Sequence, residues 1–152
     1  MDEAHKVKDT ISIHGVIRTT NTNDTGIEVH MMCGIPSNII LIDEFAEYFD
    51  GFLIGSNDLT QLTLGLDQSS PDVFNENNHA VLKLIEMAIE GAKRNNKNVG
   101  ICGQLLSNCP DIINMLIRLG IDNVCVAIDN FMMTLMIIQQ YEMQAFGEEI
   151  IG

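Results

Sequence analysis

The chain has 152 residues, 46% of them hydrophobic, which is enough for one domain with an apolar core over residues 1–152. Its formal net charge of −13 repels phosphate backbones and excludes nucleic acid as a partner. No apolar run is long enough to span a membrane, no signal peptide is evident and the four cysteines lack zinc-ligand spacing, so we expect a cytoplasmic protein with reduced thiols.

In chain order, an opening helical pattern is followed by four short apolar runs, and each run precedes another helical pattern. The expected strands are residues 27–33, 52–55, 99–102 and 124–128. The expected helices are residues 2–14, 37–49, 79–95, 110–119 and 130–146, the first of them ending at Gly15. Residues 18–26 and the polar stretch that follows the second strand are expected to be loops.

Terminal signals support several of these helices. The helix over residues 79–95 has a single apolar face and basic residues near its C-terminal end, as the helix dipole prefers. Pro110 is placed to begin a helix and Gly120 to end it, while Asn130 is a suitable N-cap. Alternating strands and helices predict an α/β fold with parallel strands and right-handed crossovers.

Polar or reactive residues follow three of the four expected strands. They are Cys33 and Gly34, then Ser56, Asn57 and Asp58, then Cys102, Gly103 and Gln104. Because parallel α/β folds collect ligand groups at the carboxyl ends of their strands, these three clusters are expected to form one shared site.

The residues of this expected site allow either a functional or a purely structural role. Asp58 could ligate a hard cation and Asn57 could add an amide oxygen, but Asn and Asp also favour turns for purely local reasons. Cys102 lies between Gly100 and Gly103, where small residues allow a ligand to approach closely. Free cysteine is also a common buried packing residue, so the residues alone leave both alternatives open.

Two long stretches carry a family resemblance. "MMCGIPSNIILIDEFAEYFDGFLIGSNDLTQLTLGLD" and "VGICGQLLSNCPDIINMLIRLGIDNV" resemble the C-terminal part of the phosphoenolpyruvate-utilising enzymes. The resemblance extends from about Glu3 to Tyr141, and Ser56 together with "LTLGLD" is most similar to the synthase branch. It implies that the four strands are the last four β/α units, the C-terminal half, of a TIM (β/α)8 barrel that binds phosphoenolpyruvate or pyruvate.

The resemblance also implies roles for individual residues. Gly55, Ser56, Asn57 and Asp58 would contact the substrate, and Asp58 would also ligate Mg²⁺. Cys102 would be the catalytic proton donor to the enolate carbon, on the face opposite the cation.

The chain departs from the family pattern at charged positions. Gly34 stands where the family's "EIPSN" motif has its second metal carboxylate, which implies a Mg²⁺ site that is weakened or lost. Gln68 and the sequence Glu76-Asn77-Asn78-His79 replace stretches in which the family has arginine, so cations that could bind an anionic substrate are missing.

Two functional hypotheses follow from the resemblance. In the first, the chain is a fragment or subunit of a phosphoenolpyruvate synthase-like phosphotransferase, which converts ATP, pyruvate and water to AMP, phosphoenolpyruvate and phosphate. A partner chain would then supply the missing half-barrel, phosphohistidine and nucleotide domains, and this chain alone would be inactive. In the second, it is a catalytically silent half-barrel remnant that self-associates or binds a partner, since half a barrel leaves open edges and an uncovered inner face.

Overall fold

The computed structural model describes residues 2–13, 27–66 and 75–149, with side chains described as far as residue 143. Its centre is a four-stranded sheet in the order β1-β2-β3-β4, and every neighbouring pair is parallel. The strands are β1 (His30–Cys33), β2 (Gly51–Gly55), β3 (Asn98–Cys102) and β4 (Asn123–Val124). The predicted parallel α/β fold is confirmed.

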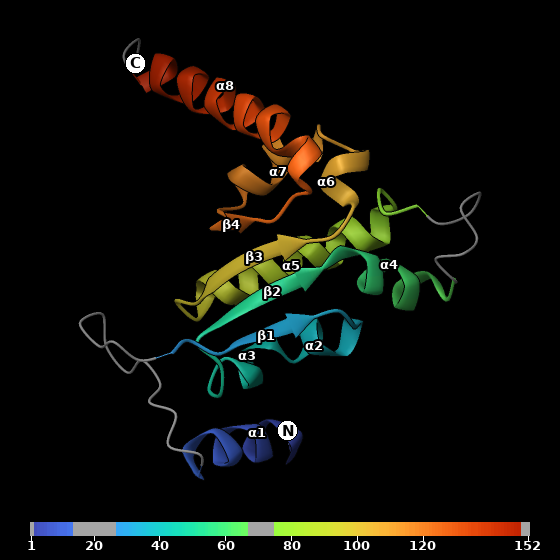
Figure 1. The fold of residues 1–152 in the computed structure, drawn as a ribbon, viewed down its shortest axis with the longest axis vertical. Coiled ribbons are helices and arrows are strands. Elements are labelled where there is room, and N and C mark those ends of the chain that lie inside the picture. Colours follow the sequence, from blue (N-terminus) through green and yellow to red (C-terminus); the bar gives the residue numbers. More distant parts are fainter. Residues whose placement is uncertain (1, 14–26, 67–74, 150–152) are drawn as a thin grey trace.

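Helices connect and flank the strands (Figure 1). They are α1 (Asp2–Ile13), α2 (Pro36–Ile40), α3 (Ile42–Phe45), α4 (Ser56–Leu64), α5 (His79–Arg94), α6 (Leu105–Asn108), α7 (Ile112–Arg118) and α8 (Phe131–Glu149), with a 3₁₀ turn η1 (Ile128–Asn130) before α8. In Figure 1, α1 and α8 lie at opposite ends of the molecule, with the sheet between them. Among the described residues, no helix is both long and apolar enough to cross a membrane.

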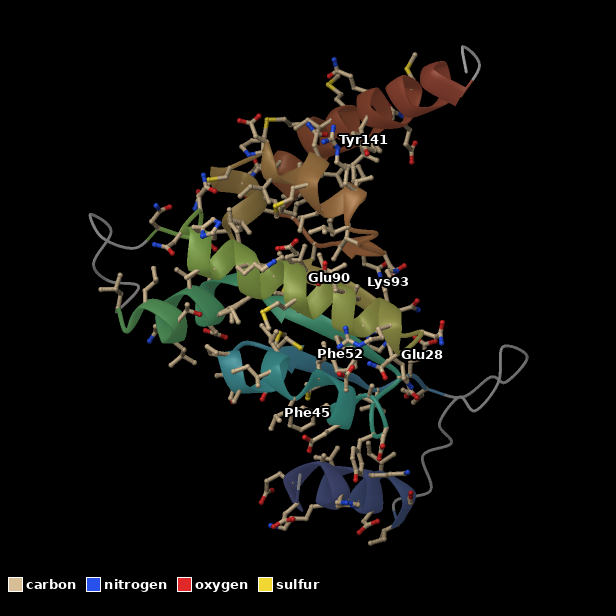
Figure 2. All side chains as sticks on the ribbon, turned by 180° about the vertical axis from the view of Figure 1, so that it is seen from behind. Glu28, Phe45, Phe52, Glu90, Lys93 and Tyr141 are labelled. Carbon is tan, nitrogen blue, oxygen red and sulfur yellow. The ribbon has the colours of Figure 1, made fainter. Side chains whose placement is uncertain are left out.

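One face of the sheet forms the hydrophobic core against α5. Phe52 is aligned with Val99 and Ile54 with Ile101 in the strand register, and all four side chains are buried. They face α5, which lies across this side of the sheet in Figure 2. The side chains that form the buried stripe of α5 are Val81, Ile85, Ala88, Ile89 and Ala92. This stripe has the spacing expected of one helix face, so the predicted helix is confirmed together with its buried side.

The opposite face of the sheet is open to solvent in part. Its central row consists of Met32, Leu53, Gly100 and Asn123, which are aligned across the four strands. Met32 keeps 47% of its surface exposed and Asn123 is exposed. Figure 1 views the sheet from this side, with α5 behind it.

The amino ends of two strands are fixed by the same hydrogen-bond arrangement. Asp50 donates its backbone N–H to the Val29 carbonyl (2.9 Å) and accepts from the Val29 N–H through its carboxylate (2.7 Å). Asp122 makes the equivalent pair with Val99, at 2.9 and 2.8 Å. Partial burial raises the pKa of Asp122, but hydrogen bonds from Lys93 and the Val99 amide outweigh it and hold that pKa below its ordinary value. These contacts fix the strand register and therefore align the carboxyl ends.

The prediction of a polar loop after β2 is wrong at its beginning, because residues 56–64 form α4. Gly55 is the extended N-cap residue, and Gly65 ends the helix in a left-handed conformation with φ 65°. The carboxylate of Asp58 lies in the first helical turn, where the dipole favours negative charge. The polar residues that directly follow β2 therefore begin a helix.

Other predicted elements are shorter or divided, including the first strand, which is expected over residues 27–33 and is only His30–Cys33. The helix predicted over residues 37–49 is broken at Leu41 into α2 and α3. The one predicted over residues 110–119 begins two residues later, at Ile112, and α6 precedes it. The last strand is only Asn123–Val124, since the backbone then turns into η1. The predicted helix end at Gly15, the loop over residues 18–26 and Gln68 lie outside the described residues.

Candidate functional site

The carboxyl ends of β1, β2 and β3 bring the three predicted clusters together. Gly55 and Cys102 are aligned neighbours at the ends of β2 and β3. A hollow of about 120 Å³ lies at this edge, lined by Met32, Gly55, Ser56, Asn57, Asp58, Cys102 and Gly103. We call this group, with Gly34 and Gln104, the strand-end site.

Asn57 joins the two sides of the strand-end site. Its side-chain oxygen accepts a hydrogen bond from the Gln104 backbone N–H at 2.9 Å and one from the Ser56 hydroxyl at 3.2 Å. The first turn of α4 is thereby attached to the loop after β3. Asn57 does not simply cap a local turn, because its partner Gln104 lies 47 positions further along the chain.

Gly103 makes this contact possible. It has φ +125°, a conformation that side-chain-bearing residues rarely adopt. A Cβ atom there would lie 2.6 Å from the Asn57 side-chain oxygen and would also collide with the Ser56 hydroxyl. Glycine at this position therefore allows the β3 loop to pack directly on the start of α4.

Glu76 is a buried acid that supports the site and was not identified as a site residue from the sequence. It is 4% exposed and accepts a hydrogen bond from the Ser56 hydroxyl at 2.7 Å. Its second oxygen accepts from the Asn108 amide at 3.0 Å. A continuous set of hydrogen bonds thus runs from Gln104 through the α4 start to α6, and it positions residues 56–58.

Asp58 lies between two hollows. Besides the hollow beside Cys102, it lines a second one of about 250 Å³ with Met32, Gly34, Ile35, Asn38, Gln61 and Leu62. A Cβ atom at Gly34 would lie 3.3 Å from the Asp58 Cβ and 3.7 Å from its Oδ2. A longer acidic side chain at position 34 would therefore share this space with the Asp58 carboxylate.

The residues present do not fit a metal site made by this protein alone. Within the described part of the chain, no group of three or more His, Cys, Asp or Glu side chains is arranged to hold a metal ion. The strand-end site offers the single carboxylate of Asp58, whereas a hard divalent cation prefers six or more oxygen ligands. Most ligands would have to come from water or a bound molecule.

Cys102 differs from the fully buried cysteine of the core. Burial raises the pKa of the Cys33 thiol to about 12, and Cys33 is an inert packing residue. Cys102 is only partly buried and lines the smaller hollow. Burial raises the pKa of its thiol, and the neighbouring Cys125 and Asp58 raise it further. The Cys102 thiol consequently keeps its proton at neutral pH.

Replacing Asp58 with asparagine is expected to lower the pKa of Cys102, because it removes one of the negative charges that oppose thiolate formation. The rate of alkylation of Cys102 by iodoacetamide, followed by mass spectrometry across a pH series, measures this pKa. The profile should move to lower pH in Asp58→Asn and stay unchanged in Asp9→Asn, a control on α1. An unchanged or upward-shifted profile in Asp58→Asn would contradict the geometry.

Comparisons with known proteins agree on one family. A family model described as the PEP-binding domain of PEP-utilising enzymes matches residues 1–143. Phosphoenolpyruvate synthases are similar in sequence: that of Synechocystis sp. is 46% identical over 144 residues, covering 93% of this chain and 17% of the relative. Those of Helicobacter pylori and Escherichia coli are 45% and 44% identical, covering 78% and 88% of this chain and 15% and 17% of theirs. The chain therefore spans only about a sixth of the length of these curated relatives.

Solved structures show the same fold at low sequence identity. An aldolase/citrate lyase family protein from Burkholderia cenocepacia superimposes with a TM-score of 0.54 at 15% identity, covering 84% of this chain and 44% of the other. The citrate synthase SbnG gives a TM-score of 0.57 at 14% identity, covering 96% and 60%. These neighbours are TIM-barrel-like proteins, and together with the four parallel strands they confirm that the chain has the β/α units of part of a TIM barrel.

Proposed function

Because this chain belongs to the family of PEP-utilising enzymes, through their PEP-binding domain, we propose that its strand-end site is part of a pyruvate or phosphoenolpyruvate site. The enzyme concerned would be a phosphoenolpyruvate synthase-like phosphotransferase. One observation carries the proposal: the consecutive residues 56–58 and the distant Cys102 line one hollow at the carboxyl ends of parallel strands. That edge is where barrel enzymes bind their ligands.

The chain's own groups would orient a small acid between α4 and Cys102. Backbone N–H groups in the first turn of the nine-residue α4 favour an anionic oxygen, as helix N-termini generally do. The Asp58 carboxylate in the same turn opposes an anion unless a cation lies between them. The protonated Cys102 thiol on the other side of the hollow could then deliver its proton to a carbon atom of the ligand.

We propose that Mg²⁺ binding is weak and depends on the ligand. Asp58 would supply one carboxylate, and the oxygens of pyruvate or phosphoenolpyruvate would supply others. A bound cation would neutralise negative charge on those oxygens. Gly34 offers no ligand group, so the affinity without a bound acid should be low.

The complete reaction of ATP, pyruvate and water would need more than this chain. The chain corresponds to 15–17% of the length of the synthases cited above, so the nucleotide, phosphohistidine and remaining barrel parts would have to come from elsewhere. We propose that the described residues act as a partial substrate site and give no turnover by themselves.

Thermal unfolding with ligands tests the proposed site. Mg²⁺ with oxalate, a non-reactive mimic of enolpyruvate, is expected to raise the melting temperature of the chain, and each component alone should have less effect. Asp58→Asn should abolish the combined response, while the matched variant Asp9→Asn on α1 should keep it. A response of equal size in Asp58→Asn, or no response in the unmodified chain, would contradict the proposed site.

A second function, a self-associating half-barrel, is favoured by the exposed apolar surface. Within the described residues, β1 and β4 are the unpaired edges of the sheet. Helix α8 also exposes a set of apolar side chains: Phe131, Met132, Met133, Leu135, Met136 and Met143. Surfaces of this kind associate with other protein surfaces in water.

We expect the purified chain to elute from size-exclusion chromatography as a dimer or larger species at micromolar concentration, as judged by light scattering. Replacing Met132 and Met136 with lysine should shift the distribution toward monomer, because both side chains are more than half exposed on α8. Met87→Lys, at an exposed apolar residue of α5, is the control and should leave the distribution unchanged. A stable monomer of the unmodified chain would exclude this second function and leave the ligand site unaffected.

A further inference from the structure

Cys102 is the last residue of β3, and Cys125 directly follows β4, the strand paired with it. The register of β3 and β4 aligns Gly100 with Asn123 and Ile101 with Val124. Continued by one residue, it would place Cys125, which directly follows β4, beside Cys102. The Cys125 backbone N–H donates to the Ile101 carbonyl at 2.9 Å, which holds Cys125 against the end of β3. Neighbouring strands lie about 4.8 Å apart, within the roughly 4.4–6.8 Å range of Cα separations that disulfides need.

Both thiols also belong to the same face of the sheet. Ile101, the residue before Cys102, is buried in the core beneath α5, and Val124 is its aligned partner. Because side chains alternate along strands, Cys102 and Cys125 belong to the opposite, open face. The two groups are close enough to interact electrostatically, since Cys125 raises the pKa of the Cys102 thiol. Cys125 is exposed and Cys102 is partly so, which makes both reachable by a small oxidant.

We propose that Cys102 and Cys125 form a reversible disulfide under peroxide. The Cys125 thiolate attacks hydrogen peroxide, a sulfur–oxygen bond forms, the oxygen–oxygen bond breaks, and water leaves after protonation. The Cys102 sulfur then attacks the resulting sulfenic acid. A sulfur–sulfur bond forms, the sulfur–oxygen bond breaks, and the departing hydroxide takes the Cys102 proton as water. Two thiols lose one electron each, and the two peroxide oxygens gain them.

The structure assigns different parts to the two cysteines. Cys125 is the more exposed, so it meets the oxidant first. Burial raises the pKa of the Cys102 thiol, which makes Cys102 a poor nucleophile for the initial attack on peroxide. Because Cys125 is exposed, the proposed disulfide between Cys102 and Cys125 should be readily reduced by thiols.

The disulfide would remove the Cys102 proton from the strand-end site, and this consequence rests on the function proposed above. The site would then keep its cation ligand Asp58 but lose its proton donor. Formation of the bond itself depends only on the strand register and the accessibility of the two thiols.

Peptide mapping of the full chain tests the proposal. After treatment with hydrogen peroxide and blocking of free thiols with N-ethylmaleimide, digestion should yield a linked pair of peptides that contain Cys102 and Cys125. The pair should lack two hydrogens relative to the separate peptides and disappear after treatment with dithiothreitol. Cys125→Ser should abolish the linked pair and leave Cys102 alkylated, whereas Cys109→Ser should not change it.

Two outcomes would overturn the proposal: Cys102 remaining fully alkylated in the oxidised chain, or Cys102 linking to Cys109 or to a second copy in preference to Cys125. Circular dichroism of Cys125→Ser shows whether that variant is folded, and the unmodified chain alone already decides the linkage. Oxalate binding by the reduced chain is measured separately. A missing disulfide with intact oxalate binding therefore counts only against the disulfide, and the converse counts only against the proposed function.

Discussion

Replacing Gly34 with glutamate is expected to raise the affinity of the chain for Mg²⁺ by about ten- to a hundredfold. A Cβ atom at position 34 would lie 3.7 Å from the Asp58 Oδ2, so the new carboxylate would extend beside the existing one into a hollow of about 250 Å³. Two unit charges about 4 Å apart interact by roughly 1–4 kcal/mol at the effective dielectric constants of a protein surface, and a divalent cation between two carboxylates gains from both. Each 1.4 kcal/mol corresponds to about a factor of ten in affinity.

The same substitution should destabilise the chain when no cation is present. Two like charges would face each other, and the new Cβ, 3.3 Å from the Asp58 Cβ, requires a small shift. Calorimetric titration with Mg²⁺ or Mn²⁺ and thermal unfolding with and without the cation measure both effects. Gly34→Gln has the same size without the charge and is the control. Equal affinities for the glutamate and glutamine variants would contradict the placement of position 34 beside Asp58.

Replacing Gly103 with alanine is expected to lower the free energy of unfolding by about 2–4 kcal/mol and to abolish ligand responses at the strand-end site. The backbone conformation at φ +125° strains any residue with a Cβ, and this Cβ would also collide with the Ser56 hydroxyl and the Asn57 oxygen. The loop after β3 would have to move away, and the hydrogen bond from Gln104 to Asn57 would break.

Gly65→Ala is the matched control for this prediction. Gly65 also has a positive φ, of 65°, but an added Cβ would meet nothing within 4 Å. Its substitution should therefore cost only about 1 kcal/mol of backbone strain and leave ligand binding intact. Urea denaturation of the three proteins gives the comparison. Equal losses for the two alanine variants would mean that the contact of Gly103 with α4 contributes little.

The parts of the fold that depend on local pattern could be predicted from the sequence. The apolar stripe and the basic end of residues 79–95 identify α5, because one helix face repeats at a fixed spacing. The apolar runs identify the strands, and their alternation with helices identifies the parallel sheet. The grouping of Ser56, Asn57, Asp58 and Cys102 at one edge follows from the direction of the strands alone.

The parts that depend on contacts between distant residues could not be predicted. The buried Glu76 carboxylate is satisfied by hydrogen bonds from Ser56 and Asn108, and neither residue is near Glu76 in the sequence. The break at Leu41 has no proline or glycine to mark it. Residues 56–58 have the composition of a turn, which conceals the start of α4; the glycine at position 65, which ends the helix, is a local signal that could have revealed it. Local composition does not show which of these polar groups will meet.

We propose that residues 56–58 and 102–104 bind a small acid together with Mg²⁺, and amide chemical-shift mapping distinguishes this from binding elsewhere in the chain. In ¹⁵N-correlated NMR spectra, titration with oxalate in the presence of Mg²⁺ should shift the backbone amides of Asn57, Asp58, Gly103 and Gln104, which surround the hollow or close it. The amides of α1 and the amino ends of the strands should not move. Saturating shifts confined to the named amides would support the claim. Unchanged amides at these positions, or the largest shifts elsewhere in the chain, would contradict it.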